Sequence, residues 1–272
     1  MKLFICPNRT REKQLEAAAR CIALLEERCD AQCRLSAENS STLFGSLSHE
    51  GTPEDCDLVV SVGGDGAVLR AAQTAIRYRK PIVGINAGRL GYLCALNAAD
   101  LETADERIFG DLRVSERLLL EFSLEGRIYT ALNDVIAAKK DFGATVALRA
   151  HQGDTQIAEW RGDGIVAATP TGSTSYSFSA GGPVVDPSLS AVILTPICPH
   201  FGDARSVILN ADDPISLSVK DPQYNTACIY SDGVKIGDLH DTVTIRRSPF
   251  RLPLLTAKNQ ITPNKEEEQA TK

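Results

Sequence analysis

The feature that most constrains the fold is a short apolar run that ends in a glycine turn. Leu58-Val59-Val60-Ser61-Val62 leads directly into Gly63-Gly64-Asp65-Gly66, and a helical pattern follows over residues 67–79. A continuous run of this kind is typical of a central strand in a parallel sheet. A strand, a glycine turn and a helix in this order predict a crossover unit whose backbone N–H groups point at a phosphate.

A carboxylate stands inside this turn, at Asp65. It would repel a phosphate unless it had a chemical task, such as accepting a proton from an attacking hydroxyl or holding a metal ion, and phosphoryl transfer needs both. The turn is not a Walker A loop, because no Gly-Lys-Ser/Thr follows, and it does not match G-x-G-x-x-G. The alternative interpretation is a tight surface turn with a solvated aspartate.

The first third of the chain alternates strand-like and helix-like patterns. The predicted elements are, in chain order, 2–6 (strand), 12–28 (helix), 57–62 (strand), 67–79 (helix), 81–85 (strand) and 98–109 (helix). Thr10 is the expected N-cap of the first helix. Such alternation favours a parallel sheet with crossover helices, and therefore an α/β domain over residues 1–112.

From about residue 113 the pattern changes to many short β-like stretches. Residues 116–138 read as two strands that turn at 125–127, and a helical stretch is expected to begin near Ser173. Further strands are predicted at 144–150, 155–160, 164–168, 192–195, 206–209, 215–219, 227–231 and 242–246. This pattern indicates an antiparallel all-β domain over 113–246. We expect 247–258 to pack back on the first domain and the polar end, 259–272, to be disordered.

Composition narrows the classes of partner. The formal net charge of −6 and the isoelectric point of about 5.3 argue against nucleic acid or an anionic membrane as a partner. No apolar run reaches the roughly 18 residues of a membrane span. None of the eight cysteines forms C-x-x-C, and the four histidines are dispersed. We therefore expect reduced thiols, a cytoplasmic location and no zinc or histidine metal site.

Two further segments place unusual residues next to apolar strands. Gly84–Leu93 lies where the carboxyl end of a parallel strand would open onto a crevice, and Tyr92 could pack on a ligand ring there. The alternative is a left-handed turn with a core aromatic. Asn133 and Asp134 interrupt an apolar strand, where an amide and an acid are unfavourable unless hydrogen-bonded. They could bind donors of a nucleoside, unless they lie on an edge strand facing water.

A third segment is dense in hydroxyl groups. Arg161-Gly162-Asp163-Gly164 leads through an apolar stretch into Thr169-Pro170-Thr171-Gly172-Ser173-Thr174-Ser175-Tyr176. Small hydroxyls at a helix start suit amides, ribose hydroxyls or phosphates. Asp163 places another carboxylate between glycines, where a backbone must come close. The alternative is a well-capped helix, which needs only one of these hydroxyls. The segment is not a nucleophile elbow, since G-x-S-x-G is absent.

Taken in order, these blocks resemble the NAD kinase family. The resemblance rests on Gly63–Gly66, Gly84–Leu93, Asn133-Asp134 and, above all, RGDGIVAATPTGSTSYSFSAGGPVVDP from Arg161 to Pro187, continuing to His200. Lipid kinases and phosphofructokinases share the first turn but not the long block. The resemblance covers about residues 57 to 233. It implies a Rossmann-like α/β domain followed by an antiparallel β-sandwich-like domain.

The resemblance also implies a reaction, the transfer of a phosphoryl group from ATP, or polyphosphate, to the adenosine-ribose 2′-hydroxyl of NAD to give NADP. It makes Asp65 the base or orienter of that hydroxyl, and brings the backbone of Gly63, Gly64 and Gly66 to phosphate and Mg²⁺. The implied dinucleotide contacts are Tyr92, Thr171 and Thr174 on the adenine side, Asn133 and Asp134 at ribose hydroxyls, and Arg161, Asp163, Ser175, Tyr176, Cys198, His200 and Asp232 around them.

Family members are oligomers with a shared site. The resemblance therefore implies a dimer or tetramer in which Asp163, Ser175 and Tyr176 reach a dinucleotide held mainly by the neighbouring subunit. The departures from the family pattern are mild. Ala67 replaces the usual hydroxyl residue after the turn, and Asp134 stands where Glu is common. In addition, Tyr92 replaces the usual Phe, Ser175 replaces the usual Ala, and Val234 replaces a common Gln.

Two other functions compete with this prediction. A kinase for another hydroxyl, on a lipid or a sugar phosphate, would have an apolar or cationic acceptor pocket and would not use NAD. A non-catalytic nucleotide sensor would bind its ligand without turnover. Replacing Asp65 with Asn would leave the behaviour of such a sensor unchanged, whereas it would impair a kinase.

Overall fold

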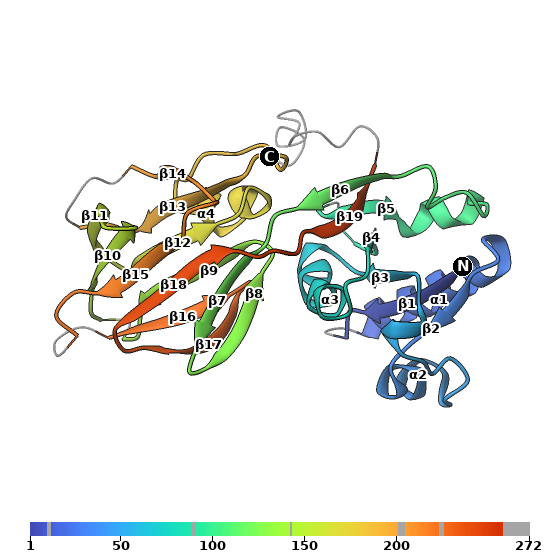
Figure 1. Cartoon of the computed structure of the whole chain (residues 1–272). Helices are drawn as coiled ribbons and strands as arrows, with labels where there is room; N and C mark the ends of the chain where they lie inside the picture. The colour runs from blue at the N-terminus through green and yellow to red at the C-terminus, as the bar shows by residue number, and fades with distance from the viewer. Residues whose placement is uncertain (10–11, 89–90, 142, 201–204, 223–225, 258–272) are drawn as a thin grey trace, which may run out of the picture. The chain divides into compact units, whose positions relative to one another are not determined.

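The computed structural model describes residues 1–9, 12–88, 91–141, 143–200, 205–222 and 226–257 (Figure 1). The chain forms two compact units. One consists of Met1–Glu116 together with the residues from Leu252 onward, and the other of Arg117–Arg251. The expected N-cap Thr10 and the predicted disordered tail lie outside the described residues. Within the described part, no helix is long and apolar enough to cross a membrane.

The first unit is built on a largely parallel sheet. Its strands lie in the order β2 (Gln32–Arg34), β1 (Lys2–Pro7), β3 (Leu58–Val62), β4 (Ile82–Asn86), β19 (Leu252–Thr256) and β6 (Arg113–Arg117), and β5 (Cys94–Asn97) also pairs with β4. Every residue of β3 is buried, as the apolar run predicts. The short 3₁₀ turn η1 (Pro53–Asp55) leads into this strand.

Helices cover both faces of this sheet. On one face, α1 (Glu12–Arg28) packs Ile22 and Leu25 into a cluster that also contains Val83 and Ile85 of β4. Gly84 lies between those two strand residues and therefore points to the other face. A Cβ there would lie 2.8 Å from Val68 Cγ2 on α3 (Asp65–Tyr78). The glycine thus lets α3 pack closely against β4.

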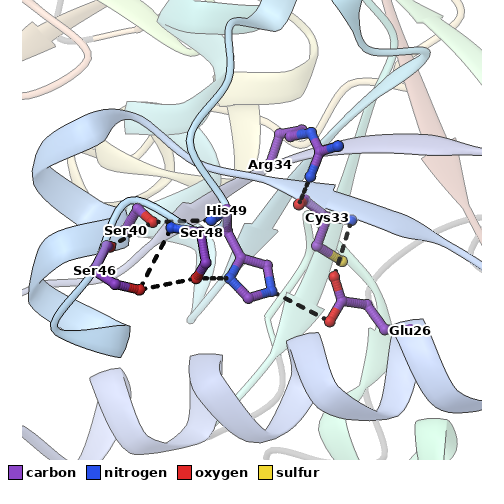
Figure 2. A network of polar contacts seen from close by, with 7 residues as sticks. All are labelled: Glu26, Cys33, Arg34, Ser40, Ser46, Ser48 and His49. Carbon is purple, nitrogen blue, oxygen red and sulfur yellow. Dashed lines mark hydrogen bonds and ion pairs between the residues drawn. The ribbon is translucent and has the colours of Figure 1, made fainter.

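The segment after β2 is attached to α1 by a network of polar contacts (Figure 2). It contains α2 (Ala37–Phe44), which ends at a left-handed Gly45. The carboxylate of Glu26 on α1 contacts residues on either side of α2. Its Oε1 accepts from Cys33 N at 3.4 Å, and its Oε2 lies 3.3 Å from His49 Nε2. The His49 ring also stacks on Phe44, with ring centroids 4.2 Å apart. One carboxylate therefore holds residues 33 to 49 against the helix.

The second unit consists of two antiparallel sheets. The strands of one sheet lie in the order β11 (Thr155–Gly162), β10 (Val146–Gln152), β15 (Ile215–Val219), β18 (Thr242–Arg247), β7 (Leu120–Leu124) and β8 (Arg127–Ala131). Those of the other lie in the order β14 (Val207–Asn210), β13 (Ala191–Ile197), β12 (Gly164–Ala168), β9 (Asp134–Lys139), β16 (Ala227–Ser231) and β17 (Val234–Leu239). One apolar core joins them, with Phe122 and Leu148 from the first sheet and Ile165 and Leu194 from the second. The predicted fold class, α/β followed by an antiparallel β-sandwich, is confirmed.

Several predicted elements differ from the observed ones. The helix expected at 98–109 is a short 3₁₀ helix, η2 (Ala98–Thr103), which ends where Ala104 becomes extended. The helix expected near Ser173 consists of two short turns, η3 (Thr171–Thr174) and α4 (Tyr176–Ser179). The two strands expected over 116–138 are parts of β6 to β9. The elements β2, α2, η1, β5, β17 and β19 were not predicted as helices or strands.

Candidate active site

Asp65 is the first residue of α3 and follows the N-cap Gly64. Its half-buried carboxylate is directed at the segment between β4 and β5. Tyr92 N donates to Asp65 Oδ2 at 2.8 Å, and Leu93 N donates to Oδ1 at 2.9 Å. Each carboxylate oxygen retains capacity to accept another hydrogen bond. The turn is therefore not the solvated surface turn of the alternative interpretation, because the backbone fixes the direction of the acid.

Two glycines make this arrangement possible. A Cβ at Gly91 would lie 2.2 Å from Asp65 Oδ1 and 2.5 Å from Asp65 Cγ, far inside contact distance. Gly63 has φ +151°, and a Cβ there would lie 2.7 Å from Ala67 Cβ. Sequence reasoning placed Gly91 only within a glycine-rich block. Its individual role was missed, and the only available signal was its position one residue before Tyr92.

Other groups line the same turn. Cys94 Sγ lies 3.6 Å from Gly63 O, and burial, assisted by the charge of Asp65, raises the pKa of this thiol to about 12. The thiol is therefore unreactive at neutral pH. At the end of β1, Asn8 Oδ1 accepts from Arg70 Nη2 at 2.9 Å. A Cβ at Gly66 would lie 3.8 Å from Arg70 Nη1, so the structure places a cation beside the turn that sequence reasoning missed.

An open cavity of about 570 Å³ lies between the start of α1, the end of β4 and η2. This volume falls in the usual range for small-molecule sites. Its polar lining includes Lys13, Arg20, Asn86 and Asn97. Asn86 is buried and shapes the loop after β4, since its Nδ2 donates to Gly88 O and to Asn97 Oδ1. Tyr92, farther along this loop, is 47% exposed, so it is not the core aromatic of the alternative interpretation.

In the second unit, Asn133 and Asp134 lie at the start of β9, which runs between β12 and β16. Their exposures are 6% and 3%, so the alternative of an edge-strand pair facing water is wrong. Asn133 Oδ1 and Thr171 Oγ1 are both buried and have no hydrogen-bond partner among the described residues. Buried polar atoms are rarely left in this state, so these two oxygens are candidate acceptors for donors of a polar ligand.

Several of the predicted site residues in this unit interact with one another. Burial raises the pKa of Asp134 to about 7, and the negative charge of Asp232 acts in the same direction. Burial also raises the pKa of the Tyr176 phenol, with smaller contributions from Cys198, Asp163 and Asp134. These five residues come from five separate places in the second unit. The fold thus brings them within electrostatic range of each other, as a common site requires.

Asp163 lies where the chain passes from β11 to β12. The flanking glycines are tightly enclosed, since a Cβ at Gly162 would lie 2.7 Å from Cys198 O and one at Gly164 would lie 2.4 Å from Ala137 O. The Asp163 carboxylate pairs with Lys139 Nζ at 2.7 Å, a partner that sequence reasoning did not identify. The neighbouring Arg161 is exposed.

Two more predicted residues follow β13. His200 N donates to Arg161 O at 2.7 Å, which ties this segment to the end of β11. Cys198 is exposed and adopts a left-handed conformation with φ 44°. No disulfide joins any of the eight cysteines, all of which lie in the described part of the chain.

In the hydroxyl-rich segment, three hydroxyl side chains form hydrogen bonds with the backbone. Thr169 and Ser173 bind backbone: Thr169 Oγ1 donates to Leu132 O at 2.6 Å, and Ser173 Oγ accepts from Val185 N at 3.0 Å. Thr174 Oγ1 donates to Thr171 O at 3.4 Å, and Ser175 is half-buried before α4. Neither Pro170 nor Ser175, the N-cap residues of η3 and α4, makes a side-chain cap. Thr169 Oγ1 accepts from Gly172 N at 3.0 Å, so one hydroxyl of the segment has the capping role of the alternative interpretation.

The chain matches two family models. Residues 9–111 match the ATP-NAD kinase N-terminal domain, and residues 132–257 match the ATP-NAD kinase C-terminal domain. An NAD kinase of Chlorobaculum tepidum is 35% identical over 266 residues, which is 94% of this chain and 91% of the relative. An NAD kinase of Heliobacterium modesticaldum is 42% identical over 190 residues, which is 65% of this chain and 67% of the relative.

Solved structures agree with these matches. An NAD kinase from Archaeoglobus fulgidus in complex with ATP has a TM-score of 0.75 and 27% identity, and the match covers 96% of both chains. A yeast NADH kinase complexed with NADH has the same fold, with a TM-score of 0.80 at 22% identity over 96% of this chain and 84% of that chain. The two family models together cover most of the sequence. The chain therefore belongs to the NAD kinase family of enzymes.

Proposed function

We propose that the chain transfers a phosphoryl group from ATP to the adenosine-ribose 2′-hydroxyl of NAD, with Asp65 as the base or orienter of that hydroxyl. The observation that carries this proposal is the carboxylate of Asp65, fixed by Tyr92 N and Leu93 N at the start of α3. A general base must be held within hydrogen-bond reach of the proton that it accepts. A positively charged helix N-terminus beside it favours the phosphates of a donor.

The acceptor is proposed to bind through the polar groups of the second unit. Asn133 Oδ1 and Thr171 Oγ1 are buried oxygens that hydroxyl or amino donors of NAD would satisfy. Asp134, next to Asn133, would accept from ribose hydroxyls. The other proposed contacts of the dinucleotide are Tyr92, Arg161, Asp163, Thr174, Ser175, Tyr176, Cys198, His200 and Asp232.

The residues of the turn fit a magnesium ion that the donor carries. Among the described residues, no group of three or more His, Cys, Asp or Glu is arranged to hold a metal ion. Mg²⁺ commonly needs only one or two protein carboxylates, because phosphates and waters complete its shell. An ion near Gly63–Gly66 would be held by the phosphates of the donor and by water, beside the carboxylate of Asp65. When bound, such an ion neutralises charge that develops on the phosphates.

We also propose a cytoplasmic homo-oligomer, a dimer or tetramer, with no nucleic acid or membrane partner. In it Asp163, Ser175 and Tyr176 contact a dinucleotide held mainly by the neighbouring subunit. Mixing two impaired variants tests this. If the site is shared, refolded mixtures of Asp65→Asn and Tyr176→Ala chains will regain activity that neither variant has alone. Light scattering of the unmixed protein will give the number of subunits.

The decisive assay supplies the purified chain with Mg²⁺, NAD or NADH, and either ATP or polyphosphate. NADP is then measured with an NADP-specific dehydrogenase. We expect NADP from NAD and ATP, a choice of donor that the ATP complex of the Archaeoglobus fulgidus relative supports. Absence of NADP with every donor would contradict the proposal. Turnover of a lipid or sugar phosphate in its place would favour the competing kinase, and binding without turnover would favour a sensor.

A further inference from the structure

The segment Leu132–Asp134 has an unusual set of partners. Its three backbone N–H groups all donate to the carboxylate of Asp232, with distances of 2.9, 2.7 and 3.3 Å for residues 132, 133 and 134. Its carbonyls accept from Thr169 Oγ1 at 2.6 Å, Thr169 N at 2.8 Å and Asp232 N at 3.1 Å, in the same order. Each of the six backbone polar groups therefore has a partner on Asp232 or on Thr169.

Asp232 lies about 100 residues away in the sequence, in the turn between β16 and β17. Asp232 and Gly233 have φ of 47° and 80°, the left-handed values of a tight hairpin turn. Asp-Gly is common in such turns, but Asn-Gly serves the backbone equally well. The turn therefore explains the conformation of residue 232, but it does not require a carboxylate. What requires a carboxylate is the convergence of three N–H donors on one side chain.

The opposite side of the segment is equally constrained. Gly172 of η3 lies against it so closely that a Cβ would be 2.1 Å from Asn133 O. Thr169 N–H and hydroxyl come from the same stretch. Asn133 and Asp134 thus project from a backbone that is held from both sides, while Asn133 Oδ1 remains buried and unsatisfied among the described residues.

We propose that Asp232 is a positioning residue of the acceptor site, which fixes the direction of Asn133 and Asp134 and keeps a negative charge behind Asp134. This inference rests on the proposed function, in which those two side chains hold NAD. Asp232 acts through them, because both of its carboxylate oxygens are engaged by the segment.

The charge of Asp232 has a consequence for binding. Among the described residues, the titratable groups that interact electrostatically with Asp134 are Asp232, from the β16–β17 turn, and the Tyr176 phenol of α4. Burial and Asp232 raise the pKa of Asp134 to about 7. Ionised Asp134 can accept from two ribose hydroxyls, whereas the protonated acid accepts less well. NAD affinity therefore falls as the pH drops through this pKa.

The test compares Asp232→Asn with the wild type. The variant keeps the hairpin turn but loses the charge and one strong acceptor. We expect the KM for NAD to rise about tenfold, as for the loss of one charge-assisted hydrogen bond, while the KM for ATP stays within about twofold. In kcat/KM for NAD measured from pH 5.5 to 8.5, the inflection near pH 7 moves to lower pH, because the charge of Asp232, which adds to the effect of burial on the pKa of Asp134, is gone.

The control is Asp238→Asn on β17 of the same hairpin. Asp238 pairs with Lys140 and Lys235 at the surface, and its loss leaves the inflection in place. If Asp232→Asn fails to fold, as thermal unfolding would reveal, Asp134→Asn provides the second test, since it must abolish the inflection. An unmoved inflection in Asp232→Asn, or a retained one in Asp134→Asn, overturns the inference. Wild-type NADP formation in the same series separates this outcome from failure of the proposed function.

Discussion

The backbone of Gly91 lies against the carboxylate of Asp65, at a distance that leaves no room for a side chain on residue 91. The next two backbone N–H groups, of Tyr92 and Leu93, bind that carboxylate. The turn after β3 and the segment before β5 therefore form one structure. The direction of the Asp65 carboxylate, the proposed base or orienter, depends on a segment that begins more than twenty residues after it.

Gly91→Ala should impair catalysis without unfolding the protein. The new Cβ would force the Asp65 carboxylate away from its position, and displacement of a reacting group by about 1 Å can lower turnover about a hundredfold. Steady-state kinetics with NAD and ATP will measure this. Gly88→Ala is the matched control in the same loop, since a Cβ there meets nothing within 4 Å among the described residues. Equal effects of the two substitutions would contradict the prediction.

Asp65→Asn should lower kcat by orders of magnitude and change the dissociation constant for NAD little, because the proposed base acts mainly in the transition state. Single-turnover rates and calorimetric binding of NAD will separate the two effects. Asp57→Asn is a suitable control, since Asp57 also accepts a backbone N–H, from Lys2 at 2.8 Å, but is exposed and precedes β3, whereas the turn follows the other end of that strand. A large rise in the dissociation constant with near-normal turnover would exclude the proposed role.

Asp134 should make the free energy of unfolding depend on pH. Its pKa is raised from 3.8 to about 7 in the folded protein, first by burial and then by Asp232. The folded state therefore holds this proton more tightly than the unfolded state. The resulting stabilisation is fully present below about pH 3.8 and is lost as the pH rises through 7. Over this window we expect a loss on the order of 4 kcal/mol relative to Asp134→Asn.

Urea unfolding of the two proteins at several pH values will test this prediction. The comparison with Asp134→Asn is needed because acids with a lowered pKa make the protein more stable as the pH rises, opposite to Asp134. Hydrogen bonds from Ser188, for example, hold the pKa of Asp186 below its usual range. A pH-independent difference between wild type and variant would show that Asp134 is charged throughout.

Thr169→Val should destabilise the second unit and weaken NAD binding. The Thr169 hydroxyl donates to Leu132 O at 2.6 Å and accepts from Gly172 N at 3.0 Å, and the residue is fully buried. Its loss leaves two buried backbone groups unsatisfied, at a cost of about 1–3 kcal/mol each. Denaturant unfolding and NAD titration will measure the effect. Thr244→Val, at an exposed position of β18, should be nearly neutral.

Much of the fold follows from local patterns. The periodic apolar residues of α1 and the buried run of β3 give elements that coincide with the structure. The elements that were missed lack such a signal. In β17, apolar and polar residues alternate only over residues 234–236, before Gly237 and Asp238 interrupt the pattern. The predicted helix at 98–109 starts as expected, at the Asn97–Asp100 capping box, but it ends early, where Ala104 becomes extended.

In the candidate site, too, some features follow from local sequence patterns and others do not. Motif blocks indicate Asp65, Asn133 and Thr171, since unusual residue types mark them within apolar surroundings. Contacts between distant segments leave no local trace. Nothing near Asp232 in the sequence shows that its carboxylate binds residues 132 to 134, and nothing near Lys139 identifies Asp163 as its partner. These pairings depend on strand order, which one sequence does not reveal.

The position of β19 has a consequence for the synthesis of the protein. This strand pairs with β4, Leu254 with Ile82 and Leu255 with Val83. β4 leads into the loop whose backbone binds Asp65. The whole second unit, Arg117–Arg251, is made before it. While the ribosome completes that unit, the first half of β4 has an open hydrogen-bonding edge, of the kind that recruits other strands. The emerging chain thus carries its proposed catalytic turn on an unfinished sheet, and its last described strand closes the edge.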